Sequence, residues 1–217
     1  MNIAYSLKGL YPYSITEKYG TYTPLPEDSV SVAPNKLKVS NVSNPFYFPA
    51  KQTYTVSSRN IVAMATATTA LSTGQFGQFP LYVFTGEGVF ALSVGTGDIA
   101  YANSFSVTRD VCNNPDSIVS TDDAIVFSTD SGLKVLSGST VRDISSDMEG
   151  YLPTAVDSSP IIKKIAGVGG FSDKLSSTEF IYYLEEAKVG YNYEDKEVIV
   201  ANRNYPYSYV FLSLIHI

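Results

Sequence analysis

Two stretches of the chain share one pattern: apolar residues that alternate as in a β-strand, a short polar turn, and a second apolar run. The first stretch covers residues 81–93 and the second covers residues 124–137. Each run is the length of a strand, and each turn contains glycine, so both stretches are predicted to form β-hairpins. The matching positions are Phe84 with Phe127, Gly88 with Gly132 and Leu92 with Leu136, a period of 43 to 44 residues.

This period predicts how the hairpins pack. A single hairpin cannot bury its own apolar face, and hairpins that recur at this spacing usually stack as the blades of a β-propeller, about 40–50 residues each. We therefore expect an all-β chain that forms an incomplete β-propeller of hairpin blades over residues 46–211. Residues 1–45 are polar and interrupted by proline, which predicts an extended N-terminal arm or the remnant of a preceding domain.

One short helix is expected inside this pattern, near residues 177–187. Ser176 and Glu179 have the spacing of a capping box, and apolar residues follow at helical spacing up to Ala187. A third hairpin of similar size is predicted at residues 189–201. Further strands are expected at residues 53–56, 61–71 (or a short helix there) and 100–107, and the outer strand of the second hairpin is expected to continue through Val141.

Composition narrows the class of protein. The chain has 17 Tyr, 11 Phe and only 17% charged residues, which is typical of a strand-rich protein. Its net charge is −6, and its lysines and arginines are scattered, so no basic stripe is available to hold a nucleic acid. A single cysteine, Cys112, and an N-terminus without the apolar core of a signal peptide favour folding in a reducing cytoplasm, without membrane insertion.

The last six residues, 212–217, resemble the translation of the transposon mosaic-end adaptor used to prepare sequencing libraries. We expect them to be a non-native tail, and the chain to be a metagenomic fragment whose natural sequence continues beyond Phe211. The only histidine, His216, lies in this tail, so no catalytic role is assigned to it.

Two motifs have structural interpretations. Residues 95–100 match the glycine spacing of a dinucleotide-binding turn, but a strand pattern follows where that turn needs a helix, so a loop between strands is predicted. Residues 128–135 fit the Ser-x-Asp-x-Gly hairpin called the Asp box. In that motif the side chain of Asp130 would bond backbone amides, and Gly132 would take a positive φ.

No catalytic, cofactor-binding or metal-binding residue is predicted, and the chain is not expected to be an enzyme. Cys112 has no histidine partner and is expected to be a small buried or loop residue. The tyrosine-rich residues 205–209 could stack on sugars, but packing between blades explains them better. Aspartates that could act as acids or bases, or hold calcium, by residue type alone lie in predicted turns and loops: Asp110, Asp116, Asp122, Asp123 and Asp130.

Several segments together carry a family resemblance. They are residues 44–49, 74–85, 106–118, 136–138, 191–194 and 205–210. In these segments the chain resembles the tail stabilisation (nozzle or muzzle) proteins of short-tailed, crAss-like bacteriophages. The resemblance covers roughly residues 40–211 and consists of long apolar strings rather than a chemical signature.

The resemblance implies a structural protein of the virion tail, made in the cytoplasm of the host bacterium. Several copies would form a ring with portal and adaptor proteins, stabilise the tail, and line or close the channel through which DNA passes without specific binding. The alternative is a glycan-binding or sialidase-like β-propeller. That function would require paired carboxylates or an arginine cluster at the propeller axis, and the sequence shows four isolated arginines: Arg59, Arg109, Arg142 and Arg203.

Overall fold

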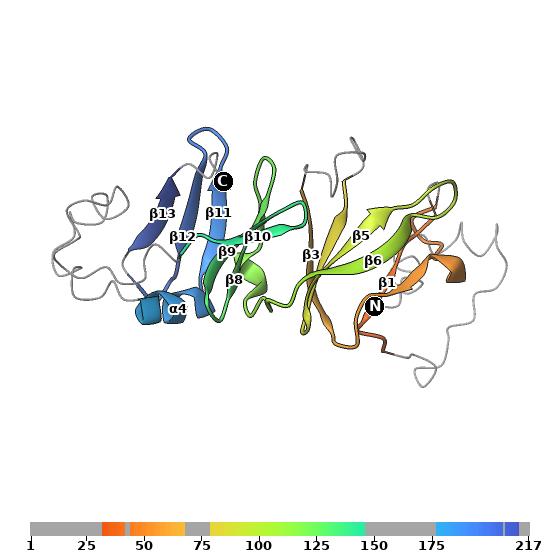
Figure 1. Ribbon diagram of the computed structural model, residues 1–217, viewed down its shortest axis with the longest axis horizontal. Coiled ribbons are helices and arrows are strands. Elements are labelled where there is room, and N and C mark those ends of the chain that lie inside the picture. The colour runs from red at the N-terminus through yellow and green to blue at the C-terminus, as the bar shows by residue number, and fades with distance from the viewer. Residues whose placement is uncertain (1–31, 42–43, 68–78, 146–176, 206, 213–217) are drawn as a thin grey trace, which may run out of the picture.

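The computed structural model of the protein describes residues 32–41, 44–67, 79–145, 177–205 and 207–212 (Figure 1). Strands dominate these residues, as predicted, and form four antiparallel sheets accompanied by one α-helix. The described sheets do not close into a ring. In the second, third and fourth sheets, strands that are neighbours in the sheet are also consecutive in the sequence. Each of these sheets is therefore formed by one stretch of the chain.

The first sheet, here called the ribbon, pairs only β1 (Lys36–Lys38) with β2 (Thr53–Thr55). Sheet I contains β3 (Ile61–Thr66), β4 (Leu81–Thr85), β5 (Gly88–Val94) and β6 (Tyr101–Thr108), hydrogen-bonded in chain order. Sheet II repeats this order with β7 (Val119–Ser120), β8 (Ile125–Thr129), β9 (Gly132–Ser137) and β10 (Thr140–Asp143). Sheet III contains β11 (Lys188–Asn192), β12 (Glu197–Ala201) and β13 (Ser208–Leu212).

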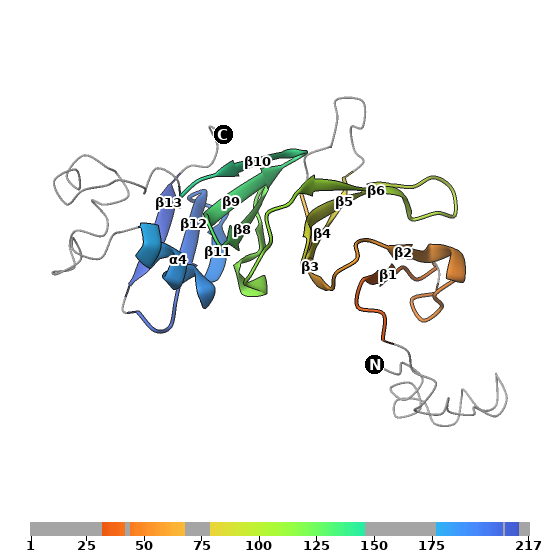
Figure 2. The same cartoon turned by 60° about the horizontal axis from the view of Figure 1, so that its bottom comes forward.

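The ribbon and the three sheets are stacked face to face in chain order (Figures 1 and 2). Alternate residues of one strand therefore enter different cores. In β4, Val83 packs toward the ribbon, whereas Tyr82 and Phe84 pack toward sheet II. In β8, Phe127 packs toward sheet I and Val126 toward sheet III. Both faces of sheets I and II are apolar, so each of these two sheets depends on a neighbour on each side.

The hairpins β4–β5 and β8–β9 share one turn geometry. Thr85 pairs with Gly88, and Thr129 pairs with Gly132. In each turn the threonine Oγ1 donates to the glycine carbonyl, at 3.0 Å in the first and 3.1 Å in the second. The same Oγ1 accepts from the backbone N–H two residues later. The two hairpins therefore superpose with Thr85 on Thr129.

This superposition corrects one predicted match. The turn sets the register, and the register places Val83, not Phe84, in the position of Phe127. Phe84 and Phe127 instead contact each other edge to face across the core between sheets I and II, with ring centroids 5.2 Å apart. Equivalent residues of the two hairpins therefore face in the same direction: Val83 faces the ribbon, which precedes sheet I, and Phe127 faces sheet I, which precedes sheet II. Sheets I and II are thus stacked head to tail.

Two other sequence predictions change in detail. β9 ends at Ser137, and the chain reverses at Gly138, with φ 58°, into the separate strand β10, so no single strand runs through Val141. The predicted third hairpin is present as β11–β12. However, β3 contacts β7, β7 contacts β11, and β6 contacts β10. β11 thus occupies the position of a first strand, and β12–β13 is the counterpart of the repeated hairpins.

The predicted helix is α4 (Ser177–Glu185), which lies against sheets II and III (Figure 2). Its apolar residues at helical spacing are buried in the core between those sheets: Phe180, Tyr183, Leu184 and Ala187, the last just beyond the helix. The predicted N-cap, Ser176, lies outside the described residues. The described residues also contain two single 3-10 turns, η2 (Ala50–Gln52) and η3 (Pro115–Ser117).

The shared turn predicts a large effect of substituting Gly88. Its φ is 127°, and a Cβ on it would lie 2.2 Å from the backbone oxygen of Thr108, which has little room to move. Gly88→Ala should therefore lower the free energy of unfolding by about 2–3 kcal/mol. Gly190→Ala is the matched control because a Cβ there meets nothing within 4 Å. Equal urea midpoints for the two variants would contradict this turn geometry.

Candidate functional site

The contacts between sheets are the best-defined candidate site in the described residues, beginning with the core between sheets I and II. The phenol of Tyr82 is buried in this core and donates to the carbonyl of Gly138 at 2.7 Å, and burial raises its pKa to about 12. Asp110, just beyond β6, accepts from Lys134 Nζ of β9 at 2.7 Å. Partial burial opposes ionisation of Asp110, but hydrogen bonds from Lys134 and Thr108 outweigh it and lower its pKa. Polar bonds therefore fix the register of the two sheets.

Asn114 joins sheet II to the helix. It lies between β6 and β7, where its Oδ1 accepts from the N–H of Asp116 and caps η3. Its Nδ2 donates to the carbonyls of Leu184 and Ala187, at 2.9 and 2.6 Å. The last carbonyls of a helix have no partner within the helix. The carbonyl of Leu184 already accepts from the N–H of Ala187 at 3.3 Å. Asn114, 70 residues before Leu184 in the sequence, supplies a further donor at the end of α4.

Sheet III holds the same end of α4 from the other side. Asn202 Nδ2 donates to the carbonyl of Tyr183 at 2.7 Å, and its backbone N–H donates to the Tyr183 hydroxyl at 2.9 Å. That hydroxyl donates to the carbonyl of Tyr207 at 2.7 Å. The rings of Tyr205, Tyr207 and Tyr209 surround Tyr183. The sequence predicted that the tyrosine-rich segment packs between blades; in the structure it leads into β13 of sheet III, and its rings pack against α4.

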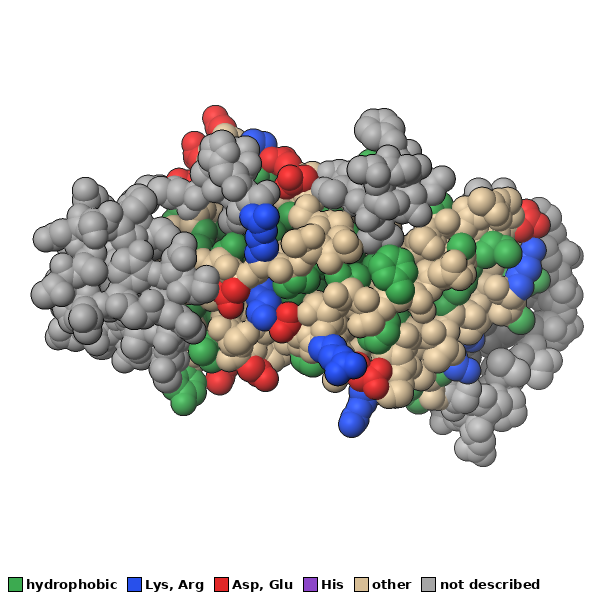
Figure 3. All heavy atoms as spheres, in the orientation of Figure 1, with side chains coloured by type: hydrophobic (Ala, Val, Ile, Leu, Met, Phe, Trp, Pro, Cys, Tyr) green, Lys and Arg blue, Asp and Glu red, His purple; other side chains and the backbone are tan. Residues whose placement is uncertain are grey.

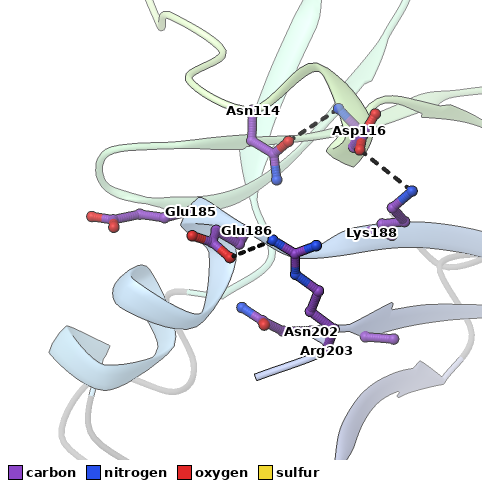
Figure 4. Close-up of a pocket in the computed structure, with 8 residues that line it drawn as sticks. Asn114, Asp116, Glu185, Glu186, Lys188, Asn202 and Arg203 are labelled. Atoms are coloured by element: carbon purple, nitrogen blue, oxygen red, sulfur yellow. Dashed lines mark hydrogen bonds and ion pairs between the residues drawn. The ribbon is translucent and has the colours of Figure 1, made fainter. Parts of the chain in front are cut away.

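Beside this helix end lies a hollow of about 610 Å³ (Figure 4). Figure 4 shows two ion pairs among its charged side chains, Asp116 with Lys188 at 3.6 Å and Glu186 with Arg203 at 3.7 Å, while Glu185 lies apart from both pairs. Because cations already engage these two carboxylates, the hollow carries nearly balanced charge. The hollow lies between the loop before β7, the end of α4 and sheet III. The residues that line it are Asn114, Asp116, Glu185, Glu186, Lys188, Ala201, Asn202 and Arg203.

Asp122 provides a further contact between sheets II and III. Its Oδ2 accepts from Lys196 Nζ at 2.7 Å and from the Tyr191 hydroxyl at 2.9 Å. These hydrogen bonds lower the pKa of Asp122. The pKa of Tyr191 is raised to about 12, first by desolvation of its hydroxyl and then by its hydrogen bond to Asp122. The turn between β7 and β8 is thereby tied to the β11–β12 hairpin.

The aspartates considered from the sequence therefore serve different contacts rather than one centre. Asp110, Asp116 and Asp122 lie in the three ion pairs above. Asp130 accepts from Asn113 Nδ2 at 2.8 Å, and the carbonyl of Asp123 accepts from Ser137. No cluster of three or more histidine, cysteine, aspartate or glutamate residues is placed to hold a metal ion within the described ranges.

The Asp-box prediction is correct for the glycine and wrong for the aspartate. Gly132 has φ 137°, as expected. Asp130, however, bonds the side chain of Asn113, and the amide of Ser131 is bonded by Thr129 Oγ1. Thr129 is the last residue of β8, one residue before Asp130, and its hydroxyl faces the turn, where it accepts from the Ser131 amide. The predicted loop at residues 95–100 is present and leads into β6, not into a helix.

The other candidates are also placed by the structure. Cys112 is buried, its thiol donates to the carbonyl of Asn114, and burial raises its pKa. Of the four arginines, Arg142 and Arg203 line two different hollows. Arg59 and Arg109 lie near Gly86 and Gly88 of the β4–β5 turn. They form no common arginine cluster in the described part of the chain.

Sequence reasoning missed Asn114 and Asn202, and it placed Tyr183 in the apolar face of the helix without foreseeing its hydrogen bonds; these three residues organise the helix end. Asn114 had one local signal, since asparagine followed by proline and aspartate is typical of a helix N-cap. Its bonds to Leu184 and Ala187 had no signal, because they join distant parts of the chain.

No protein-family model and no curated protein matches this chain. Among the described helices, none is long and apolar enough to cross a membrane.

The bonds at the end of α4 predict a selective effect of removing Asn114. Asn114→Ala would leave the carbonyls of Leu184 and Ala187 without this donor and should lower the free energy of unfolding by roughly 2–3 kcal/mol. The neighbouring, exposed Asn113 is the control, and Asn113→Ala should cost less than about 1 kcal/mol. Urea unfolding followed by circular dichroism measures both. If the two variants are equally stable, Asn114 does not hold the helix.

Proposed function

We propose that this protein is a structural component of a bacteriophage tail, built as a partial β-propeller. Its sheets form a stiff body that stabilises the portal and tail assembly. Copies of the protein, together with portal and adaptor proteins, form a ring whose interfaces line or close the DNA exit channel. The protein works through shape and interfaces, without catalytic residues.

The observation that carries this proposal is the head-to-tail stacking of sheets I, II and III. The three sheets are antiparallel and made of consecutive strands, their first strands are in contact, and the outer strands β6 and β10 are in contact. Consecutive blades of a propeller would make the same contacts, which supports the proposal. Such a stack is stiff because each core is shared by two sheets. A tail component that transmits load needs this stiffness more than it needs a pocket.

Several of the segments that carry the phage resemblance contain described residues that lie at contacts between sheets. Residues 106–118 lead from sheet I to sheet II and contain Asp110 and Asn114, which make bonds between elements. Gly138 accepts the hydroxyl of Tyr82 across the first core. Tyr209 packs against α4. These residues are ones that a shared arrangement of sheets would constrain, which supports a common architecture.

The charge distribution suits a surface that DNA passes without binding. The whole chain has 21 acidic and 15 basic residues. On the face in Figure 3, acidic and basic side chains alternate rather than gathering in a basic stripe. Such a surface gives a phosphate backbone no continuous set of cations to bind.

Immunogold electron microscopy tests the proposal directly. Antibodies raised against residues 79–145 would be applied to phage particles purified from the community that carries the gene. Gold at the tail vertex of short-tailed particles is the expected result, and pre-immune antibody is the control. Detection of the protein only in the particle-free fraction, with no label on virions, would overturn the tail role.

A further inference from the structure

Three consecutive aromatic side chains lie exposed in the loop between β1 and β2. Phe46, Tyr47 and Phe48, here called the aromatic tip, are 58%, 56% and 39% exposed. The loop is internal to the ribbon, since β1 before it pairs with β2 after it. An adjacent group of large apolar side chains in water marks a binding surface more often than a single exposed one does.

The backbone of the aromatic tip is held by hydrogen bonds. The N–H of Asn41 donates to the carbonyl of Tyr47 at 2.9 Å, and the N–H of Tyr47 donates to the carbonyl of Asn44 at 3.2 Å. Just after the tip, Gln52 Nε2 donates to the carbonyl of Asp98 at 3.0 Å, which ties the end of the ribbon to the loop between β5 and β6. The rings therefore extend into water from an ordered backbone.

The sequence around the aromatic tip is free of acidic residues, although the whole chain has a net charge of −6. Residues 29–86 contain no aspartate or glutamate and four cations: Lys36, Lys38, Lys51 and Arg59. Lys36 and Lys38 are exposed on one face of β1, and they form no ion pair with the residues that the structure describes. Lys51 pairs with Asp98 at 3.3 Å, but both side chains are mostly exposed, so this pair offsets little of the charge.

Two features favour a lipid surface over a groove on a protein. Side chains of consecutive residues leave the backbone in different directions, so one rigid groove would not accept all three rings. A fluid layer of headgroups surrounds such a tip from every side. Lysine is also depleted in protein interfaces, whereas aromatic side chains beside lysines are typical of segments that lie on anionic membranes.

We propose that the aromatic tip binds the surface of an anionic lipid bilayer. The rings of Phe46, Tyr47 and Phe48 lie among the headgroups, and Lys36 and Lys38 lie beside the lipid phosphates. The binding is peripheral and uses side chains of an ordered loop. The inference goes beyond the tail role and does not depend on it.

A tryptophan at the tip tests this placement, because the chain has no tryptophan of its own. Tyr47→Trp in the full chain would be titrated with vesicles of phosphatidylglycerol and phosphatidylcholine. We expect a saturable blue shift of its emission and quenching by brominated lipid, because the ring leaves water. Tyr182→Trp is the matched control, since Tyr182 is 60% exposed on α4 at the far end of the described stack (Figure 2). Its emission should not change.

Two results of this titration would overturn the proposal. If neither emission changes, the tip does not bind lipid, and a protein partner becomes the better explanation of its exposure. If both emissions shift equally, the protein adsorbs without using the tip.

Substitution of the rings measures their contribution. Phe46→Ser combined with Phe48→Ser should weaken binding to the same vesicles roughly tenfold or more, because the apolar area that enters the headgroups is lost. Co-sedimentation measures this affinity, and a sample without vesicles corrects for self-association. Unchanged binding of the double variant would contradict the proposed role of the tip.

Charge reversals locate the bound surface. Lys36→Glu combined with Lys38→Glu should weaken binding roughly tenfold or more. Lys188→Glu combined with Arg203→Glu makes the same change in net charge beside α4 and should have little effect. Equal losses in the two double variants, or equal affinity of the unaltered chain for vesicles of phosphatidylcholine alone, would overturn the assignment to an anionic surface.

Discussion

The structure depends on one constraint, which is that sheets I and II are apolar on both faces. A sheet with one apolar face can be covered once and end there, but these sheets need a neighbour on each side. Val83 and Phe84 are adjacent in sequence, yet they enter different cores. Stacking in chain order satisfies this need, and the Thr–Gly turns give sheets I and II the same orientation.

Much of this arrangement could be predicted because it is encoded locally. Alternating apolar residues, turn glycines and the spacing of Phe180, Tyr183 and Leu184 gave both hairpins and the helix. The predicted alignment of the two hairpins was wrong by one residue, because it matched Phe84 with Phe127 on side-chain similarity. The threonine hydroxyls in the two turns instead align Thr85 with Thr129. β10 was missed because Gly138 interrupts what otherwise resembles one continuous strand.

The contacts that join the sheets were less predictable. Asp110, Asp116 and Asp122 were recognised as acidic residues in turns, but their cationic partners lie between 24 and 74 residues away. Asn114 and Asn202 resemble ordinary loop asparagines until the helix end is placed between them. Local patterns specify strands and turns, whereas these polar bonds follow from how the sheets stack, which sequence spacing does not reveal.

A double-mutant cycle between Phe84 and Phe127 measures the stacking most directly. The two rings meet only if sheets I and II pack face to face in the register described here. Phe84→Leu and Phe127→Leu, alone and combined, should show a coupling free energy of about 1 kcal/mol in urea unfolding. A coupling below about 0.3 kcal/mol, no larger than that between Phe84 and the distant Phe211, would contradict the stacked-sheet account.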